Sequence, residues 1–296
     1  METNTILDRE YLWKDREYPA DERPGKLELI LKGKRGRLFC TYYMAGGAGT
    51  HPVVIICHGF PGNEKNLDLA AALRRVGFHV MSFHYSGSWG SDGNFSFRNC
   101  LEDTGTVFDY VMSDPELQAD TDRVFLWGHS MGGFLAYHLM VRYSPAFRKA
   151  RNQDLPEFRP AGAILAMPAD FAAMMLETEK NSDMKAEALE FLGEGAGWLT
   201  GTSGELLYRE AVGLGETQKM EHLLEYLPDV PMFFINGSED EMIPAELALD
   251  GIVKKAEERG FSGVRRLDLQ TDHMAADRRC ALTEATADWL IEQCRF

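Results

Sequence analysis

The stretch LWGHSMGGFLAYH, residues 126–138, carries the pattern Gly-x-Ser-x-Gly with Ser130 at its centre. An apolar run precedes the serine, and residues with helical spacing follow it. This context predicts a sharp strand-to-helix turn on which the serine hydroxyl stands clear of the backbone. Gly132 and Gly133 would let the helix pack close to the sheet. The alternative is a small residue at an ordinary strand–helix junction, but the context favours a nucleophilic serine.

The rest of the chain repeats this alternation of strand and helix. Residues 26–47 predict two antiparallel strands around the turn GKRG. Apolar runs then predict strands in 51–60, 79–87, 123–130, 161–169, 231–237 and 264–270. Helical spacing predicts helices in 66–78, 100–112, 131–143, 244–260 and 282–294.

Strands that alternate with helices predict an α/β fold with a mostly parallel central sheet and helices on both faces. Ligands of such sheets bind beyond the carboxyl ends of the strands, so the functional residues should follow strands directly. Residues 171–229 break the rhythm with helical pieces and Gly-rich joints, which indicates an insertion. Residues 1–25 show little pattern and are expected to form an arm of a single domain spanning 1–296.

The net charge of −15 argues against nucleic acid or an anionic membrane as the main partner. From 171 to 230 there are 12 Asp/Glu against 4 Lys/Arg, so more than half of that charge lies in the insertion. The simpler interpretation of this charge is a helical surface in contact with solvent. The alternative is a surface segment that disfavours polyanionic substrates. The charged N-terminus and the lack of a long apolar run predict a cytoplasmic protein without a membrane span.

A serine hydroxyl needs a base to take its proton, and histidine is the usual one. His273 is the best placed, because it lies in the loop between the last predicted strand and the last predicted helix. His84, after an early strand, is a weaker alternative. Position on the chain disfavours the remaining histidines, which are His51, His58, His79, His129, His138 and His222.

The base in turn needs a carboxylate to fix its tautomer. Asp240 follows the strand predicted in 231–237 and belongs to the loop proper, with the neighbouring Glu239 as its main rival. The order Ser130, Asp240, His273 is the order expected when a nucleophile sits on such a turn.

Two N–H donors must also meet the oxyanion of an acyl-transfer intermediate. The backbone N–H of Met131 follows the nucleophile, and the N–H of Phe60 in the loop CHGFPG is the second candidate. The alternative is that CHGFPG is an ordinary Gly/Pro loop. The five cysteines lack metal-like spacing, and neither a metal nor a cofactor is expected.

Four motifs in order resemble those of the α/β-hydrolase superfamily. They are HGFPGN at 58–63, GHSMGG at 128–133, GSEDEMIP at 237–244 and DHM at 272–274. Within it the chain resembles bacterial carboxylesterases of the cinnamoyl/feruloyl esterase type, and also serine aminopeptidase-like hydrolases. The resemblance implies cofactor-independent acyl-ester hydrolysis, and it implies that residues 171–229 form a lid.

Three functions follow from these residues. The favoured function is a serine carboxylesterase that acts on small or aromatic acyl esters. The alternative is a peptidase that acts on short peptides. A non-catalytic small-molecule receptor is disfavoured, because the predicted triad is complete. Trp198 is the candidate substrate-binding residue. It belongs to a group of apolar insertion residues that would either line a pocket or form the insertion's own core: Met174, Met175, Leu176, Phe191, Leu192 and Trp198. The sequence indicates no oligomeric state.

Overall fold

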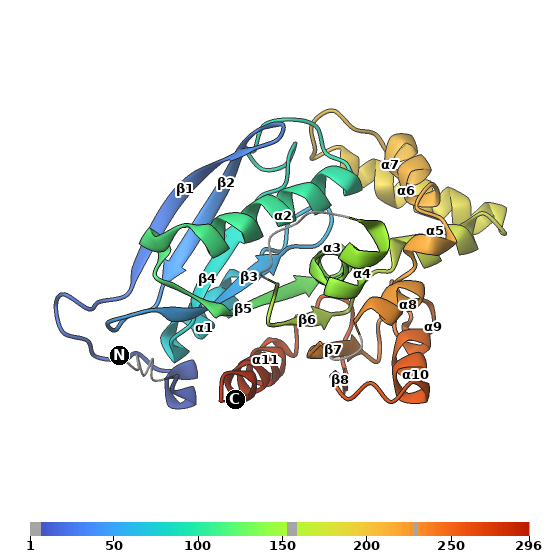
Figure 1. Ribbon diagram of the computed structural model, residues 1–296. Coiled ribbons are helices and arrows are strands. Elements are labelled where there is room, and N and C mark those ends of the chain that lie inside the picture. The colour runs from blue at the N-terminus through green and yellow to red at the C-terminus, as the bar shows by residue number, and fades with distance from the viewer. Residues whose placement is uncertain (1–6, 153–158, 228–229, 296) are drawn as a thin grey trace.

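The computed structural model describes residues 7–152, 159–227 and 230–295. In this part of the chain, eight strands form one sheet of order β1-β2-β4-β3-β5-β6-β7-β8 (Figure 1). β1 (Gly25–Gly33) and β2 (Gly36–Met44) form an antiparallel hairpin, and β2 is also antiparallel to β4. All other neighbouring strands are parallel. These strands are β3 (His51–Cys57), β4 (His79–Phe83), β5 (Ala119–His129), β6 (Gly162–Ala166), β7 (Met232–Gly237) and β8 (Val264–Leu269).

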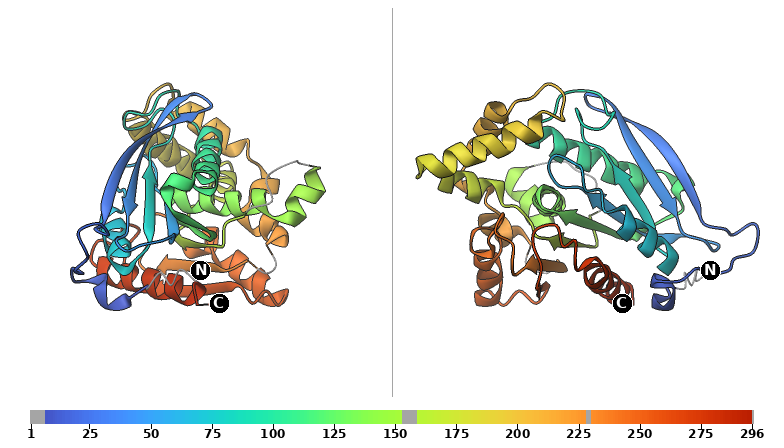
Figure 2. Two further views of the ribbon diagram at one scale, coloured as in Figure 1. Left: turned by 60° about the vertical axis from the view of Figure 1, so that its left-hand side comes forward. Right: turned by 180° about the vertical axis from the view of Figure 1, so that it is seen from behind.

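Helices cover both faces of the sheet, because successive side chains of each strand point to opposite sides. Val53 and Ile55 of β3 join one hydrophobic cluster, whereas Val54 and Ile56 join the other. The two helix layers are visible in the views of Figure 2. The first cluster packs against α2 (Phe97–Ser113), α3 (Met131–Tyr143) and α10 (Asp250–Glu258), and the second against α1 (Leu67–Val76) and α11 (Arg279–Gln293). The α/β fold predicted from the sequence is confirmed.

Two helical stretches differ from the prediction. The single helix expected in 244–260 is two helices, α9 (Ala245–Ala248) and α10, because Leu249 leaves helical geometry with φ −128° and is buried in the core. Helix α4 (Pro145–Arg151) was not predicted. It begins with a proline and is capped by Ser144, whose hydroxyl accepts a hydrogen bond from Phe147 N.

The N-terminal arm is anchored along its described part. A short 3-10 helix, Arg9–Leu12, buries Leu12 in the cluster that includes α1 and α11. Arg9 Nε donates to Asp288 of α11 at 2.8 Å. Residues 1–6 of the predicted arm lie outside the described residues.

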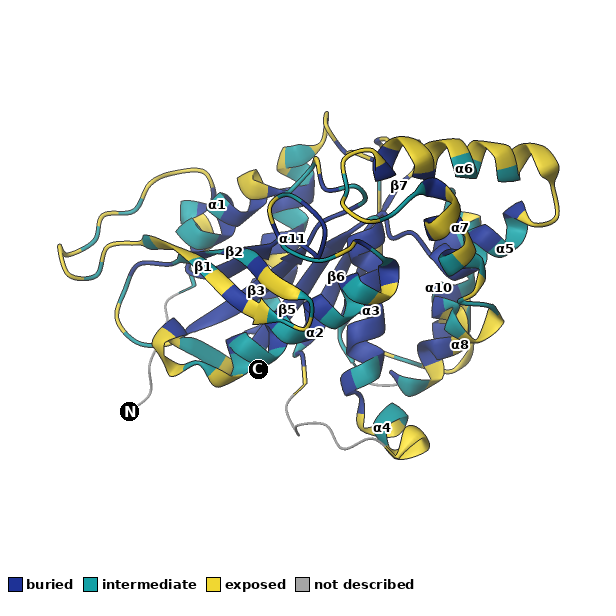
Figure 3. Cartoon of the chain, turned by 90° about the horizontal axis from the view of Figure 1, so that it is seen from above, coloured by how far each residue is buried: buried dark blue, intermediate teal, exposed yellow. Residues whose placement is uncertain are grey.

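The insertion consists of helices gathered at one end of the molecule (Figures 1 and 3). Much of α6 is exposed to solvent. Thr200 joins the insertion to the loop after β4, since Thr200 N donates to Gly87 O at 2.8 Å and Phe95 N donates to Thr200 O at 2.9 Å. The helices are α5 (Phe171–Thr178), α6 (Ser182–Ala196), α7 (Gly204–Val212), α8 (Met220–Leu223) and the 3-10 helices Glu216–Gln218 and Leu224–Tyr226. Residues 228–229 of the predicted insertion lie outside the described residues.

Candidate active site

Ser130 occupies a strained turn between β5 and α3. Its φ is 56° and its ψ is −123°, a conformation that costs a non-glycine residue about 1–3 kcal/mol. Backbone hydrogen bonds hold the turn: Ser130 N donates to Ala166 O at 3.0 Å, and Ser130 O accepts from Gly133 N and Ala169 N. This turn matches the strand–turn–helix context that the motif requires.

The glycines around Ser130 make room for close packing. A Cβ atom on Gly132 would lie 1.8 Å from the carbonyl oxygen of Cys57 in β3, and one on Gly133 would lie 2.8 Å from Pro168 Cβ. A Cβ on Gly128 would lie 2.2 Å from Gly132 O. The prediction that Gly132 and Gly133 allow α3 to approach the sheet is confirmed.

The structure brings together Asp240 and His273, which come from the loops after β7 and β8. His273 Nδ1 lies 2.7 Å from Asp240 Oδ2, and the two side chains are only 7% and 1% exposed. Since a carboxylate can only accept, Nδ1 carries the proton and Nε2 is left as the acceptor, the form that a general base needs. The other Asp240 oxygen accepts from Met242 N and Ile243 N. Glu239, the rival, is exposed and accepts from Gln270 instead.

The His129 side chain forms a hydrogen bond with the backbone of His273. Its Nε2 donates to the His273 carbonyl oxygen at 2.7 Å. Burial lowers the pKa of His129 to about 4, so the imidazole is neutral near pH 7. This contact was not predicted from the sequence, because it joins residues 144 positions apart. In the described structure no hydrogen bond joins Ser130 Oγ to His273 Nε2. In enzymes without bound substrate, hydrogen bonds between catalytic groups are often long and tighten when the substrate binds.

The loop CHGFPG lies beside Ser130. A Cβ on Gly59 would be 3.2 Å from Ser130 Cβ. His58 Nδ1 lies 2.8 Å from Gly59 O, Tyr85 Oη donates to His58 O at 3.1 Å, and burial lowers the pKa of His58 to about 3. His58 therefore stays neutral and holds the loop in shape. The oxyanion role of the Phe60 and Met131 N–H groups stays a prediction.

An apolar cavity of about 400 Å³ contains Ser130 in its wall. Such a volume fits a small organic ligand. Four of the six apolar insertion residues singled out from the sequence line it, and Leu176 and Trp198 do not. The lining residues are Phe60, Ser130, Phe171, Met174, Met175, Thr178, Met184, Glu187, Ala188, Phe191, Leu192, Glu241, Met242, Ile243, Pro244 and Leu247.

Trp198 does not line this cavity. It is 66% exposed and stacks on Trp89, with ring centroids 6.2 Å apart and planes 19° apart. The predicted substrate contact of Trp198 therefore has no support in this arrangement. The lining residues of α6 that were missed, such as Met184 and Ala188, stand in line with Phe191 at helical spacing, a signal that was present in the sequence.

The fold is similar to that of solved enzymes. Est1E from Butyrivibrio proteoclasticus has a TM-score of 0.63 at 18% identity, over 91% of this chain and 99% of that chain. A brefeldin A esterase, described as a bacterial homologue of human hormone sensitive lipase, has a TM-score of 0.63 at 16% identity, over 96% of this chain and 81% of that chain. The chain has the α/β-hydrolase fold. At these identities the likeness concerns the fold alone.

Sequence comparisons cover about a third of the chain that forms this α/β-hydrolase fold. Residues 49–151 match the family model described as serine aminopeptidase, S33. The lysophosphatidylserine lipase ABHD12 of Bos taurus is 30% identical over 104 residues, which are 34% of this chain and 25% of the lipase. The chain thus spans about a quarter of the length of the curated relatives it matches first. The family-model match contains Phe60 and Ser130 but ends before Asp240 and His273.

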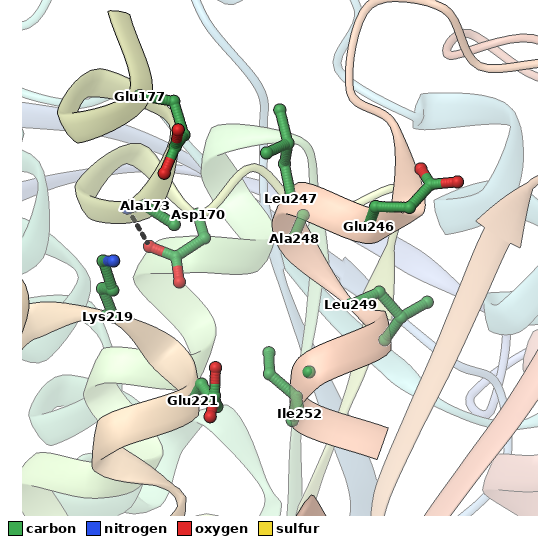
Figure 4. A pocket seen from close by; sticks show the side chains of 11 residues that line it. Asp170, Ala173, Glu177, Lys219, Glu221, Glu246, Leu247, Ala248, Leu249 and Ile252 are labelled. Carbon is green, nitrogen blue, oxygen red and sulfur yellow. Dashed lines mark hydrogen bonds between the residues drawn. The ribbon is translucent and has the colours of Figure 1, made fainter. Parts of the chain in front are cut away.

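A second, smaller pocket of about 150 Å³ in the α/β-hydrolase fold shares Leu247 with the first and lies between α5 and α8 on one side and α9 and α10 on the other (Figure 4). Buried Asp170 accepts hydrogen bonds from Ala173 N at the start of α5 and from Met220 N at the start of α8. Other charged residues line the pocket, namely Glu177, Lys219, Glu221 and Glu246. Asp170 therefore links the two ends of the insertion.

The substitution Asp170→Asn is expected to change the pH dependence of stability. Burial raises the pKa of Asp170 to about 6, although the two N–H donors and Lys219 act in the opposite direction. A raised carboxyl pKa contributes stability that is complete below about pH 4 and is lost as the pH rises through about 6. The free energy of unfolding of wild type minus variant should thus fall by about 2–3 kcal/mol between pH 4 and 7. Urea titrations at each pH measure it, and a constant or rising difference would contradict the assignment.

The described residues offer neither a metal-binding cluster nor a membrane-spanning helix. Within residues 7–152, 159–227 and 230–295, no group of three His, Cys, Asp or Glu side chains is placed to hold a metal ion. In the same residues no helix combines the length and the apolar character needed to cross a bilayer. The cytoplasmic location expected from the sequence stays a prediction.

Proposed function

We propose that the chain is a serine hydrolase that cleaves carboxylic esters with small or aromatic acyl groups through an acyl-enzyme intermediate. The observation that carries this proposal is the buried Asp240–His273 hydrogen bond, at the same edge of the sheet as Ser130 on its strained turn. A carboxylate, an oriented imidazole and a serine hydroxyl are the groups that acyl transfer requires. The apolar cavity beside Ser130 offers room for the acyl group.

In the proposed reaction, Ser130 Oγ attacks the ester carbonyl carbon while His273 Nε2 takes the hydroxyl proton. The N–H groups of Phe60 and Met131 stabilise the resulting oxyanion. The tetrahedral intermediate collapses, and the alcohol leaves with the proton from His273. Water then gives its proton to His273 and attacks the acyl-enzyme, which releases the carboxylic acid and returns the proton to Ser130. Asp240 orients His273 and stabilises its charged form in both steps.

Relatives support a hydrolase of this kind. Est1E, with its similar fold, is described with ferulic acid bound, at 17% identity to this chain. The partial match to lysophosphatidylserine lipases also fits an enzyme that cleaves carboxylic esters. Under this proposal residues 171–229 act as the lid of a single hydrolase domain, and α5 and α6 supply part of the cavity wall.

A peptidase activity is the second candidate, since residues 49–151 match the serine aminopeptidase model. Rates on p-nitrophenyl esters and on aminoacyl p-nitroanilides separate the two candidates. Turnover of the esters alone excludes the peptidase, whereas comparable turnover of the anilides favours it.

A fluorophosphonate probe tests the proposed nucleophile directly. An activated serine attacks the phosphorus atom and releases fluoride, so the probe should add covalently to the peptide that contains Ser130. Mass spectrometry of the digested protein locates the adduct. Ser182 lies in the exposed first turn of α6 and serves as an internal control that should remain unlabelled. The absence of an adduct on Ser130 would contradict the proposed function.

Asp240→Asn is expected to lower kcat by about 10²- to 10⁴-fold, because an amide favours the wrong tautomer of His273. Asparagine has one side-chain oxygen, which would have to accept hydrogen bonds both from His273 and from the N–H groups of Met242 and Ile243. The matched control is Glu239→Gln, an exposed neighbour, for which a change within about twofold is expected. Steady-state kinetics on an aryl ester compare the two variants, and a larger loss in Glu239→Gln would reassign the acid.

A further inference from the structure

Two glutamates interrupt the apolar wall of the cavity beside Ser130. Five residues of α6 line the cavity, and they form one stripe with helical spacing: Met184, Glu187, Ala188, Phe191 and Leu192. An apolar residue would be expected at position 187 if this stripe only packed against its surroundings. Glu241 is likewise an acidic residue among apolar lining residues, because Met242, Ile243 and Pro244 follow it and also line the cavity.

Both carboxylates are unpartnered in the described structure. Neither the Glu187 nor the Glu241 side chain, both of which are exposed, accepts a hydrogen bond or forms an ion pair with another described residue. Some other acids of the insertion are paired, as in Glu177–Lys180 and Glu179–Lys185, whereas the exposed Glu190 of α6 is, like Glu187, without a partner among the described residues. The cavity wall, among the residues that the structure describes, contains no Lys, Arg or His. Two acidic residues therefore border the cavity, and its described wall holds no compensating positive charge.

We propose that Glu187 and Glu241 determine charge specificity: the cavity accepts ester substrates whose acyl group is uncharged or cationic and rejects anionic ones. This inference rests on the proposed ester hydrolysis and names its substrate class. An anionic acyl group would be repelled by both carboxylates and would lose water without gaining a positive partner. A cationic group would be attracted by the same carboxylates, and each such exposed contact changes affinity about two- to fivefold.

The remaining wall selects weakly by shape, which leaves charge as the main discriminator. Four of the lining residues are methionines, Met174 and Met175 of α5, Met184 of α6 and Met242. Methionine side chains are unbranched and flexible, so they adapt to ligands of different outline. The aromatic rings of Phe60, Phe171 and Phe191 complete an apolar surface that suits alkyl and aryl acyl groups alike.

Three p-nitrophenyl esters of similar length test the inference. They are the 4-(trimethylammonio)butanoate, its uncharged isostere 5,5-dimethylhexanoate, and the adipate monoester, which bears a carboxylate. We expect kcat/KM of wild type to be at least about tenfold higher for the cationic than for the anionic ester. The double variant Glu187→Gln/Glu241→Gln should bring this ratio close to one. Raising the salt concentration should lower the wild-type ratio, because exposed charges are screened.

Glu190→Gln is the matched control, since Glu190 is an exposed glutamate of the same helix that does not line the cavity. It should keep the wild-type ratio. An unchanged ratio in the double variant, with turnover still dependent on Ser130, would overturn the charge inference and leave the esterase proposal intact. A ratio that changes equally in Glu190→Gln would also overturn it. Failure of all three esters to turn over in a Ser130-dependent manner would overturn the esterase proposal itself.

Discussion

Ser130→Ala is expected to lower turnover of p-nitrophenyl butyrate by at least about 10⁴-fold while the fold stays intact. The hydroxyl oxygen is the only atom removed, and it is the atom that forms the acyl-enzyme in the proposed reaction. The hydrogen bonds that hold the turn come from the backbone of residue 130, namely its N–H to Ala166 O and its carbonyl from Gly133 N and Ala169 N. These bonds persist in the alanine variant, so the loss should appear in activity and not in folding.

The measurement is kcat of wild type and variant, with circular dichroism and thermal unfolding to compare their folds. Ser182→Ala, which removes an exposed hydroxyl from α6, serves as the control and should keep wild-type activity. Undiminished turnover in Ser130→Ala would mean that another group performs the chemistry. A fall in activity accompanied by a large fall in the melting temperature would call for Ser130→Cys, which preserves a nucleophile of similar size at the same turn.

Gly132→Ala is expected to destabilise the fold by at least about 3 kcal/mol. The added Cβ would lie 1.8 Å from Cys57 O, 2.5 Å from Cys57 C and 2.9 Å from His58 O. These are backbone atoms of the central strand β3 and of the loop that follows it, so they cannot rotate away as a flexible side chain would. The methyl group must push α3 away from the sheet, which also displaces the turn that carries Ser130.

Gly193→Ala is the matched control, because Gly193 is an exposed glycine of α6 and a Cβ there would meet no atom within 4 Å. Removing the conformational freedom of a helical glycine should stabilise the protein by about 0.5–1 kcal/mol. Urea denaturation of the two variants measures both changes. Similar free energies of unfolding for Gly132→Ala and wild type would show that α3 can move away from β3 at little cost.

The sequence was informative wherever a local rule decides the structure. The glycines at 128 and 132 around Ser130 predict the turn, because only glycine leaves space for such close backbone approach. The alternation of apolar strands and amphipathic helices predicts the parallel sheet. From that sheet follows the meeting of Asp240 and His273, since parallel strands place their carboxyl ends at one edge.

The choice between Glu239 and Asp240 needed the tertiary structure. Both follow β7 directly, and pattern alone gives only a preference. The path of the loop after β7 settles the choice. Met242 N and Ile243 N donate to one oxygen of Asp240, and the other oxygen accepts from His273. Glu239 instead is exposed to solvent and accepts from Gln270. The contact of His129 with His273 O likewise depends on how two distant loops pack.

The sequence by itself determined the α/β architecture, the turn at Ser130 and the small set of groups available for chemistry, because these depend on local sterics and on periodicity. Only the tertiary structure decided the wall of the cavity. It assigns Glu187 and Met184 to the lining and leaves Trp198 stacked on Trp89, since the face that a helix or loop of the insertion presents to Ser130 is set by its packing on the core. The sequence gives the hydrophobicity of each residue, but whether a residue faces a cavity depends on which other residues pack around it.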